Sequence, residues 1–233
     1  MFVRDPYVTK RADMTAERFD ISWSRCRRQI HLVWIISLIL LPSPAYPLQK
    51  VSEDELTLVN VAELIPGVVL DIRYATENNF TKHILYSRAR CYLRAPVARK
   101  LAEAQAVLTR RGLGLKIFDC YRPLSVQKKL WNLVPDERYV ADPKKGSRHN
   151  RGVAVDVSLV DTSGRELPMP TDYDDFTERA HRDYMPLPVA AIKNRALLET
   201  IMQQHGFEGL PTEWWHFDFK EWERFPISDQ PID

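Results

Sequence analysis

The chain has 233 residues, of which 45% are hydrophobic, 27% are charged and only 8 are glycine, a composition that excludes a disordered, collagen-like or coiled-coil protein. Its length allows one sizeable hydrophobic core without crosslinks. The formal net charge of +2 does not indicate a nucleic-acid surface, and three cysteines are too few for a disulfide scaffold. The function must therefore come from local groups of residues.

The beginning of the chain has the pattern of an export signal. Arginines cluster within residues 25–28 and precede an apolar run over residues 32–41. That run fits the apolar region of a secretory signal and is shorter than the ~20 residues that span a bilayer. Small residues follow at Ser43 and Ala45, the positions that a signal peptidase inspects. We predict a signal peptide over residues 1–45, with an uncleaved N-terminal anchor as the alternative.

Removal of this segment changes the expected environment of the protein. The remaining chain, residues 46–233, is nearly neutral, so we expect no nucleic-acid partner, no membrane span in the mature form and a periplasmic or secreted location. Two cysteines remain, Cys91 and Cys120. An oxidising compartment permits a disulfide between them, but the sequence equally allows two buried thiols.

No linker or shift in composition divides residues 46–233, which predicts a single domain. Hydrophobic spacing distinguishes strands, with period two, from helices, with apolar residues three or four apart. The predicted elements in chain order are a strand at 68–72, a helix at 96–111, a strand at 113–121, a helix at 123–134, a strand at 153–159, a helix at 188–205 and a strand at 215–219. This mixed order lacks a regular strand-helix-strand repeat and favours an α+β fold over a doubly wound sheet.

The last two predicted strands place metal-ligating residue types on their polar faces. Asp156 alternates with the valines of residues 153–159, and His216 alternates with the aromatic residues of residues 215–219. His149 lies just before the first of these strands. Two histidines and one carboxylate leave a coordination position for water, as in catalytic rather than structural zinc sites. We therefore predict an open site for one zinc ion.

Two further residues supply what a hydrolytic zinc site needs. Glu213 lies three residues before His216, so a regular strand would send the two side chains to opposite faces. If residues 211–213 are a loop, Glu213 can act on the water as a general base without binding the metal. Arg122 follows a buried strand and precedes a proline, and its guanidinium could stabilise the oxyanion formed from a carbonyl.

Each of these residues taken singly also fits a purely structural role, so the combination carries the prediction. Two histidines and a carboxylate also form the iron site of non-haem oxygenases, but such an enzyme has no evident use for Glu213. A catalytically inactive binding module with the same fold would need neither Glu213 nor Arg122. A metal-dependent hydrolase that acts on a carbonyl accounts for all five residues.

At this point the sequence resembles the zinc D-alanyl-D-alanine dipeptidases, within the wider group of D,D-carboxypeptidases and hedgehog-like metallopeptidases. The resemblance covers nearly all of residues 58–225. The motifs that carry it are Ser147-x-His149-x-x-Gly152-x-Ala154-x-Asp156, Glu213-Trp214-Trp215-His216, Asp119-Cys120-Tyr121-Arg122-Pro123 and Tyr74-Ala75-Thr76-x-Asn78-Asn79-Phe80.

The resemblance implies a role for each matching residue. It implies that His149, Asp156 and His216 bind zinc, that Glu213 acts as general base and then acid, and that Arg122 stabilises the tetrahedral intermediate. It further implies that Asp174 receives the substrate ammonium and that Tyr74 and Ser147 line the dipeptide pocket. The implied fold is α+β, an antiparallel sheet with flanking helices of the hedgehog and D,D-peptidase type.

The implied reaction is zinc-dependent hydrolysis of the D-Ala-D-Ala dipeptide to two D-alanines, in peptidoglycan turnover or recycling. A D,D-carboxypeptidase acting on wall peptides is the alternative, because it uses the same metal set. One departure from the family is Cys120, where family members usually carry glycine or alanine.

Overall fold

The structure, a computed structural model, describes residues 51–232. The predicted signal peptide at residues 1–45 lies outside the described residues. Residues 51–232 fall within one compact unit. None of the helices in this range is long and apolar enough to cross a membrane.

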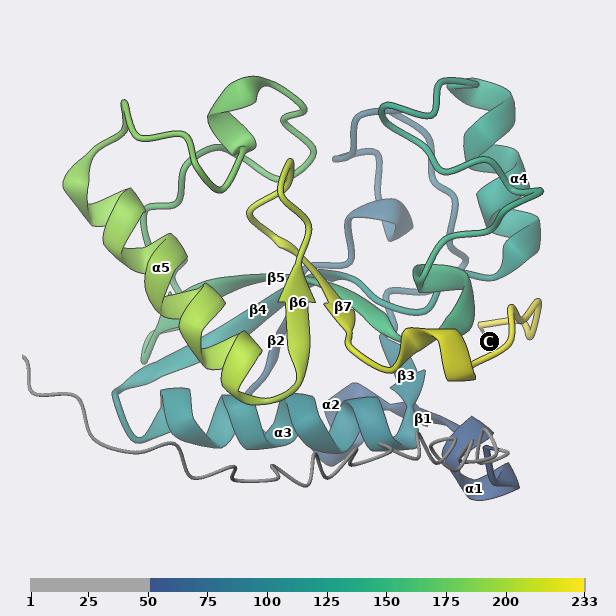
Figure 1. Cartoon of the computed structure of the whole chain (residues 1–233), viewed down its shortest axis with the longest axis horizontal. Coiled ribbons are helices and arrows are strands. Elements are labelled where there is room, and N and C mark those ends of the chain that lie inside the picture. Colours follow the sequence, from purple (N-terminus) through teal and green to yellow (C-terminus); the bar gives the residue numbers. More distant parts are fainter. Residues whose placement is uncertain (1–50, 233) are drawn as a thin grey trace, which may run out of the picture. The chain divides into compact units, whose positions relative to one another are not determined.

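A five-stranded sheet forms the centre of the fold (Figure 1). Its strands, in spatial order, are β2 (Val69–Leu70), β4 (Leu113–Asp119), β5 (Ala154–Asp161), β7 (His216–Phe219) and β6 (Phe207–Gly209). All neighbouring strands run antiparallel except β2 and β4, which are parallel. The connection from β2 to β4 contains a long helix, which is the usual form of a parallel crossover. The α+β prediction is confirmed, and the parallel β2 adds one feature to the predicted antiparallel sheet.

Two long helices, α3 (Ala95–Thr109) and α5 (Val189–Gln204), pack against the sheet and against each other. The apolar face of α3 is fully buried through Val97, Leu101 and Leu108, which recur at helical spacing. In Figure 1, α3 lies on one side of the sheet, and α4 (Leu124–Leu133) lies on the other side among long loops. The end of each predicted helix and strand lies within two residues of its predicted position.

Several short elements were not predicted from the sequence, because segments of three or four residues carry too little periodicity. They are α1 (Glu53–Leu56), β1 (Leu58–Asn60), α2 (Val61–Leu64), β3 (Tyr92–Arg94), β6 and four 3-10 helices at Arg73–Ala75, His149–Arg151, Glu178–Ala180 and Trp222–Arg224. Strands β1 and β3 pair antiparallel in a separate two-stranded sheet.

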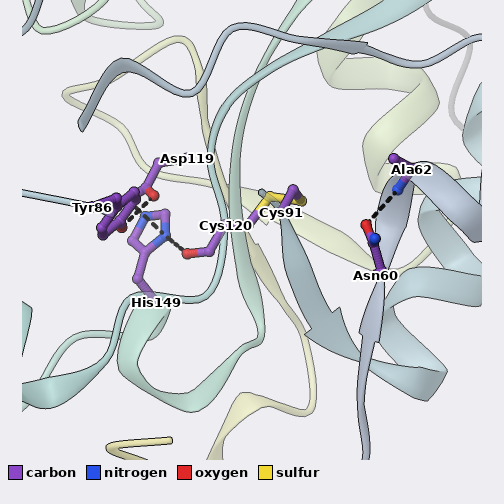
Figure 2. Close-up of a disulfide and its surroundings, with 7 residues drawn as sticks. All are labelled: Asn60, Ala62, Tyr86, Cys91, Asp119, Cys120 and His149. Carbon is purple, nitrogen blue, oxygen red and sulfur yellow. Dashed lines mark hydrogen bonds and ion pairs between the residues drawn. A yellow bond between two sulfur atoms is a disulfide. The ribbon is translucent and has the colours of Figure 1, made fainter. Parts of the chain in front are cut away.

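A disulfide joins Cys91, next to β3, to Cys120, which follows β4 (Figure 2). The Cα atoms of the two cysteines are 5.4 Å apart. The structure thus decides between the two alternatives that the sequence left open. The bond crosslinks the two sheets at the point where β4 ends.

Candidate metal centre

Neighbouring strands bring two of the predicted ligands together. Asp156 on β5 lies directly opposite His216 on β7 in the antiparallel register. His149 comes from the 3-10 helix before β5, and the chain returns into the strand through Gly152, whose φ is 73°. Residues other than glycine rarely adopt that backbone conformation, and a Cβ at position 152 would lie 2.9 Å from Leu58 Cδ2. The turn therefore places His149 over the beginning of β5.

The three side chains present one potential ligand atom each within 4.8 Å of one another. His149 Nε2 lies 3.3 Å from His216 Nδ1 and 3.5 Å from Asp156 Oδ1, and His216 Nδ1 lies 2.9 Å from Asp156 Oδ1. Tetrahedral zinc with bonds of ~2.1 Å separates its ligand atoms by about 3.4 Å. The spacing and the donor types of this cluster fit a zinc ion.

Hydrogen bonds on the far side of each imidazole fix its orientation. His149 Nδ1 donates to the Cys120 carbonyl oxygen, 2.6 Å away, beside the disulfide (Figure 2). His216 Nε2 donates to Asp218 Oδ1 at 2.9 Å. The backbone N–H of His149 also donates to Ser147 Oγ at 3.2 Å. With one ring nitrogen protonated, the other offers its lone pair to a metal.

The carboxylate of Asp156 is held in the ionised state. Burial by itself would raise its pKa, but the adjacent His149 and His216 outweigh burial and lower that pKa below its ordinary value. The hydroxyl of Tyr173 donates to Asp156 Oδ2 at 3.0 Å and leaves Oδ1 facing the two histidines. Asp156 therefore has the charge and the orientation of a metal ligand.

A second cluster around Arg122 lies beside the histidines. Asp119 Oδ2 accepts hydrogen bonds from Arg122 Nε at 3.2 Å and Nη2 at 2.6 Å, while Gln127 Oε1 accepts from Nη1 at 2.8 Å. The guanidinium also lies over the Tyr74 ring, 5.0 Å from its centroid. Tyr86 donates to the other oxygen of Asp119 at 2.6 Å (Figure 2). These contacts hold the Arg122 guanidinium in one orientation.

Glu213 lies in the loop between β6 and β7, and β7 begins only at His216. The loop predicted at residues 211–213 is therefore present. The Glu213 side chain is half-buried in the pocket wall. Burial raises its pKa, although the nearby His216 opposes the rise. A buried carboxylate with a raised pKa is a stronger proton acceptor, and it can later return the proton that it accepts.

Asp174 combines backbone strain with an unpaired carboxylate oxygen, as expected of a binding residue. Its φ of 62° lies in the left-handed region, which aspartate tolerates better than most residues. Its Oδ2 atom is buried and makes no hydrogen bond among the described residues, whereas the Tyr74 hydroxyl donates to Oδ1 at 3.5 Å. Burial, together with the charges of Asp156 and Glu213, raises the Asp174 pKa well above its ordinary value. A cation in the pocket would relieve this unfavourable environment.

Every predicted site residue lines one pocket of about 320 Å³. These residues are Tyr74, Arg122, Ser147, His149, Asp156, Asp174, Glu213 and His216. The volume is at the small end of the range for ligand sites and suits a short peptide. The structure therefore brings together groups from five separate stretches of the sequence.

Known proteins resemble this chain over most of its length. The profile described as D-ala-D-ala dipeptidase matches residues 54–230. The chain belongs to the D-Ala-D-Ala dipeptidase family. A D-alanyl-D-alanine dipeptidase of Escherichia coli K12 is 38% identical over 178 residues, covering 76% of this chain and 92% of the relative. A D-alanyl-D-alanine dipeptidase of Enterococcus faecium is 30% identical over 194 residues, covering 73% of this chain and 95% of the relative.

A solved structure of a vancomycin-resistance D,D-pentapeptidase in complex with Zn(II) was also found, with a TM-score of 0.38 and 17% identity over 73% of this chain and 90% of that chain. The chain described here has its own cluster of two imidazoles and one carboxylate, and these are donors that zinc takes in catalytic sites. Zinc is the cofactor that the pocket fits.

Sequence reasoning did not identify several residues that build the dipeptidase site. Asp119 stands in a family motif, but nothing in its spacing indicates that it would hold Arg122. Three aromatic residues of the pocket wall were also not predicted, namely Tyr139, Tyr173 and Phe176. Tyr139 and Phe176 belong to no motif and meet only in space, with ring centroids 5.1 Å apart.

Proposed function

We propose that this chain is a zinc-dependent dipeptidase that hydrolyses D-Ala-D-Ala to two D-alanines, with His149, Asp156 and His216 as the zinc ligands. One observation carries the proposal. A single small pocket combines this ligand set with a half-buried carboxylate, a fixed guanidinium and a second carboxylate that has one unpaired buried oxygen. These are the groups that hydrolysis of a short peptide with a free amine requires.

Substrate orientation follows from the two charged ends of the pocket. Asp174 receives the substrate ammonium, because its unpaired buried oxygen offers the negative charge that a cation needs. Arg122, held by Asp119, directs N–H groups toward the oxygen of the scissile carbonyl, where negative charge develops. Tyr74 contacts both residues and holds them in fixed positions relative to each other.

Glu213 carries out the proton transfers of the reaction. When bound, zinc polarises the scissile carbonyl and lowers the pKa of water to about 7. Glu213 accepts the proton that the attacking water loses as its oxygen bonds to the carbonyl carbon. It then donates that proton to the amide nitrogen as the C–N bond breaks. The C-terminal D-alanine thereby gains its free amine, and the N-terminal D-alanine gains its carboxyl group.

The test of this function uses purified protein and free D-Ala-D-Ala and measures the release of D-alanine. We expect hydrolysis that a chelator abolishes and added zinc restores. We also expect N-acetyl-D-Ala-D-Ala to be hydrolysed at least about a hundredfold more slowly, because acetylation removes the ammonium that Asp174 would bind. Equal rates on the free and acetylated dipeptides would instead assign the chain to the D,D-carboxypeptidases, and hydrolysis unaffected by the chelator would contradict a zinc enzyme.

We further propose that the protein is exported and that it recycles dipeptide released from peptidoglycan in the periplasm. The apolar run over residues 32–41 supports export, and the Cys91–Cys120 disulfide is consistent with an oxidising compartment. Cell fractionation followed by mass spectrometry of the native N-terminus tests this. We expect a periplasmic or secreted protein that begins near residue 46, and a cytosolic protein retaining residues 1–45 would contradict the proposal.

A further inference from the structure

The loop over residues 210–215 carries Glu213 and leads directly into His216, and a buried arginine from another part of the chain holds it. Arg182 Nε donates to the Leu210 carbonyl oxygen at 2.9 Å. Its Nη2 donates to two further carbonyl oxygens, those of Trp214 at 3.1 Å and His216 at 2.8 Å. One guanidinium thus contacts the loop on both sides of Glu213.

These contacts extend to the backbone of Glu213 itself. The Leu210 carbonyl that Arg182 holds also accepts the N–H of Glu213 at 3.2 Å. The His216 carbonyl that Arg182 holds also accepts the N–H of Leu210 at 3.2 Å. Because the guanidinium is planar and rigid, it fixes the relative positions of all three carbonyls.

The surroundings of Arg182 are built for a guanidinium. Its side chain is only 9% exposed. The guanidinium stacks on Phe217, with Cζ 4.3 Å from the ring centroid, and Nη1 lies 3.7 Å from Glu199 Oε2. Burial lowers the pKa of Arg182 to about 10, which still leaves it cationic at neutral pH. A Cβ at Gly209 would overlap the Arg182 Cζ and Nε atoms, so only glycine leaves room for the guanidinium in this position.

Burying an arginine costs free energy that an apolar side chain would not. The loop it holds contains the general base of the proposed reaction and adjoins one zinc ligand. We propose that Arg182 is a positioning residue, which acts through the loop over residues 210–215 to place Glu213 against the reacting water. This inference rests on the proposed function, because it concerns the geometry of the same reaction.

Two variants disturb this contact from opposite sides. Arg182→Lys keeps the charge but loses the fork that binds three carbonyls, and Gly209→Ala keeps Arg182 while displacing its guanidinium. With saturating zinc, we expect each variant to lower kcat on D-Ala-D-Ala by about ten- to a hundredfold, because a displacement near 1 Å can cost about a hundredfold in rate. We expect KM to stay within about twofold, since Asp174 is untouched.

Hydrogen exchange of the backbone provides a readout that does not depend on activity. In both variants, with or without zinc, we expect faster exchange at the amides of Leu210 and Glu213, because each donates to a carbonyl that Arg182 holds. Unchanged exchange at these two amides would overturn the inference. If the wild-type protein fails to hydrolyse the dipeptide, the proposed function fails, while the exchange result still decides whether Arg182 orders the loop.

Arg195→Lys is the matched control. Arg195 is also a buried arginine, and it donates to the carbonyls of His181 and Tyr184, both at 2.9 Å, without bonding to the loop over residues 210–215. We expect this variant to lose stability but retain kcat within about threefold at a temperature where it is folded. An equal loss of kcat in Arg195→Lys without faster exchange at the amides of Leu210 and Glu213, or normal kcat in both test variants, would reduce Arg182 to a structural role.

Discussion

Glu213→Gln is expected to abolish nearly all turnover while the protein still binds zinc. Glutamine matches glutamate in shape but cannot accept a proton, so kcat on D-Ala-D-Ala should fall by about a hundred- to ten-thousandfold. Zinc stoichiometry should remain at one per chain, since the three clustered donors are His149, Asp156 and His216. The measurements are steady-state kinetics and metal analysis on the same preparation.

Glu208→Gln is the control for this change, because Glu208 is exposed on β6 of the same hairpin and lies outside the pocket. It removes one negative charge close in sequence to the site and should leave kcat within about twofold. Full activity of Glu213→Gln would exclude Glu213 as the base. A Glu213→Gln protein that no longer binds zinc would instead place Glu213 among the ligands.

Asp174→Asn is expected to weaken substrate binding more than any other single change outside the zinc ligands and Glu213. Loss of one partner of a buried charge pair costs about 2–5 kcal/mol, which corresponds to a rise of at least about thirtyfold in KM for D-Ala-D-Ala. Asparagine tolerates the positive φ of this position, so the backbone should remain in place. Steady-state kinetics across a substrate series would measure the effect.

The pH dependence of KM gives a second readout for Asp174. Burial raises the pKa of this carboxyl group, so lowering the pH protonates it and removes the charge that would bind the ammonium. In the wild-type protein, KM should therefore fall as the pH rises through the range in which Asp174 ionises. Asp174→Asn should lose this dependence, because asparagine does not titrate.

Asp172→Asn serves as the control for Asp174→Asn. Asp172 is exposed, lies two residues earlier and does not line the pocket. The KM of the Asp172→Asn protein should therefore stay within about twofold of the wild-type value. If Asp174→Asn also leaves KM unchanged, the ammonium binds elsewhere. If both substitutions raise KM equally, the effect comes from the net charge of the segment and not from a specific contact.

The sequence by itself predicted the residues of the candidate metal centre and most of the helices and strands. Long helices and strands repeat their apolar residues at short intervals, so α3, α5 and β5 could be predicted from neighbours along the chain. The proposed metal ligands, His149, Asp156 and His216, were predicted because they lie in dense local motifs. Their convergence within 4.8 Å followed once β5 and β7 were paired.

Only the tertiary structure decided the contacts that hold these residues in place. The Cys91–Cys120 bond, the clamp of Asp119 on Arg122 and the three carbonyls bound by Arg182 form no pattern that sequence spacing displays. Each depends on distances between backbone segments that are set by the packing of the whole sheet, and no local periodicity encodes such distances. The identity of the reacting groups is therefore a property of short motifs, whereas their orientation is a property of the assembled fold.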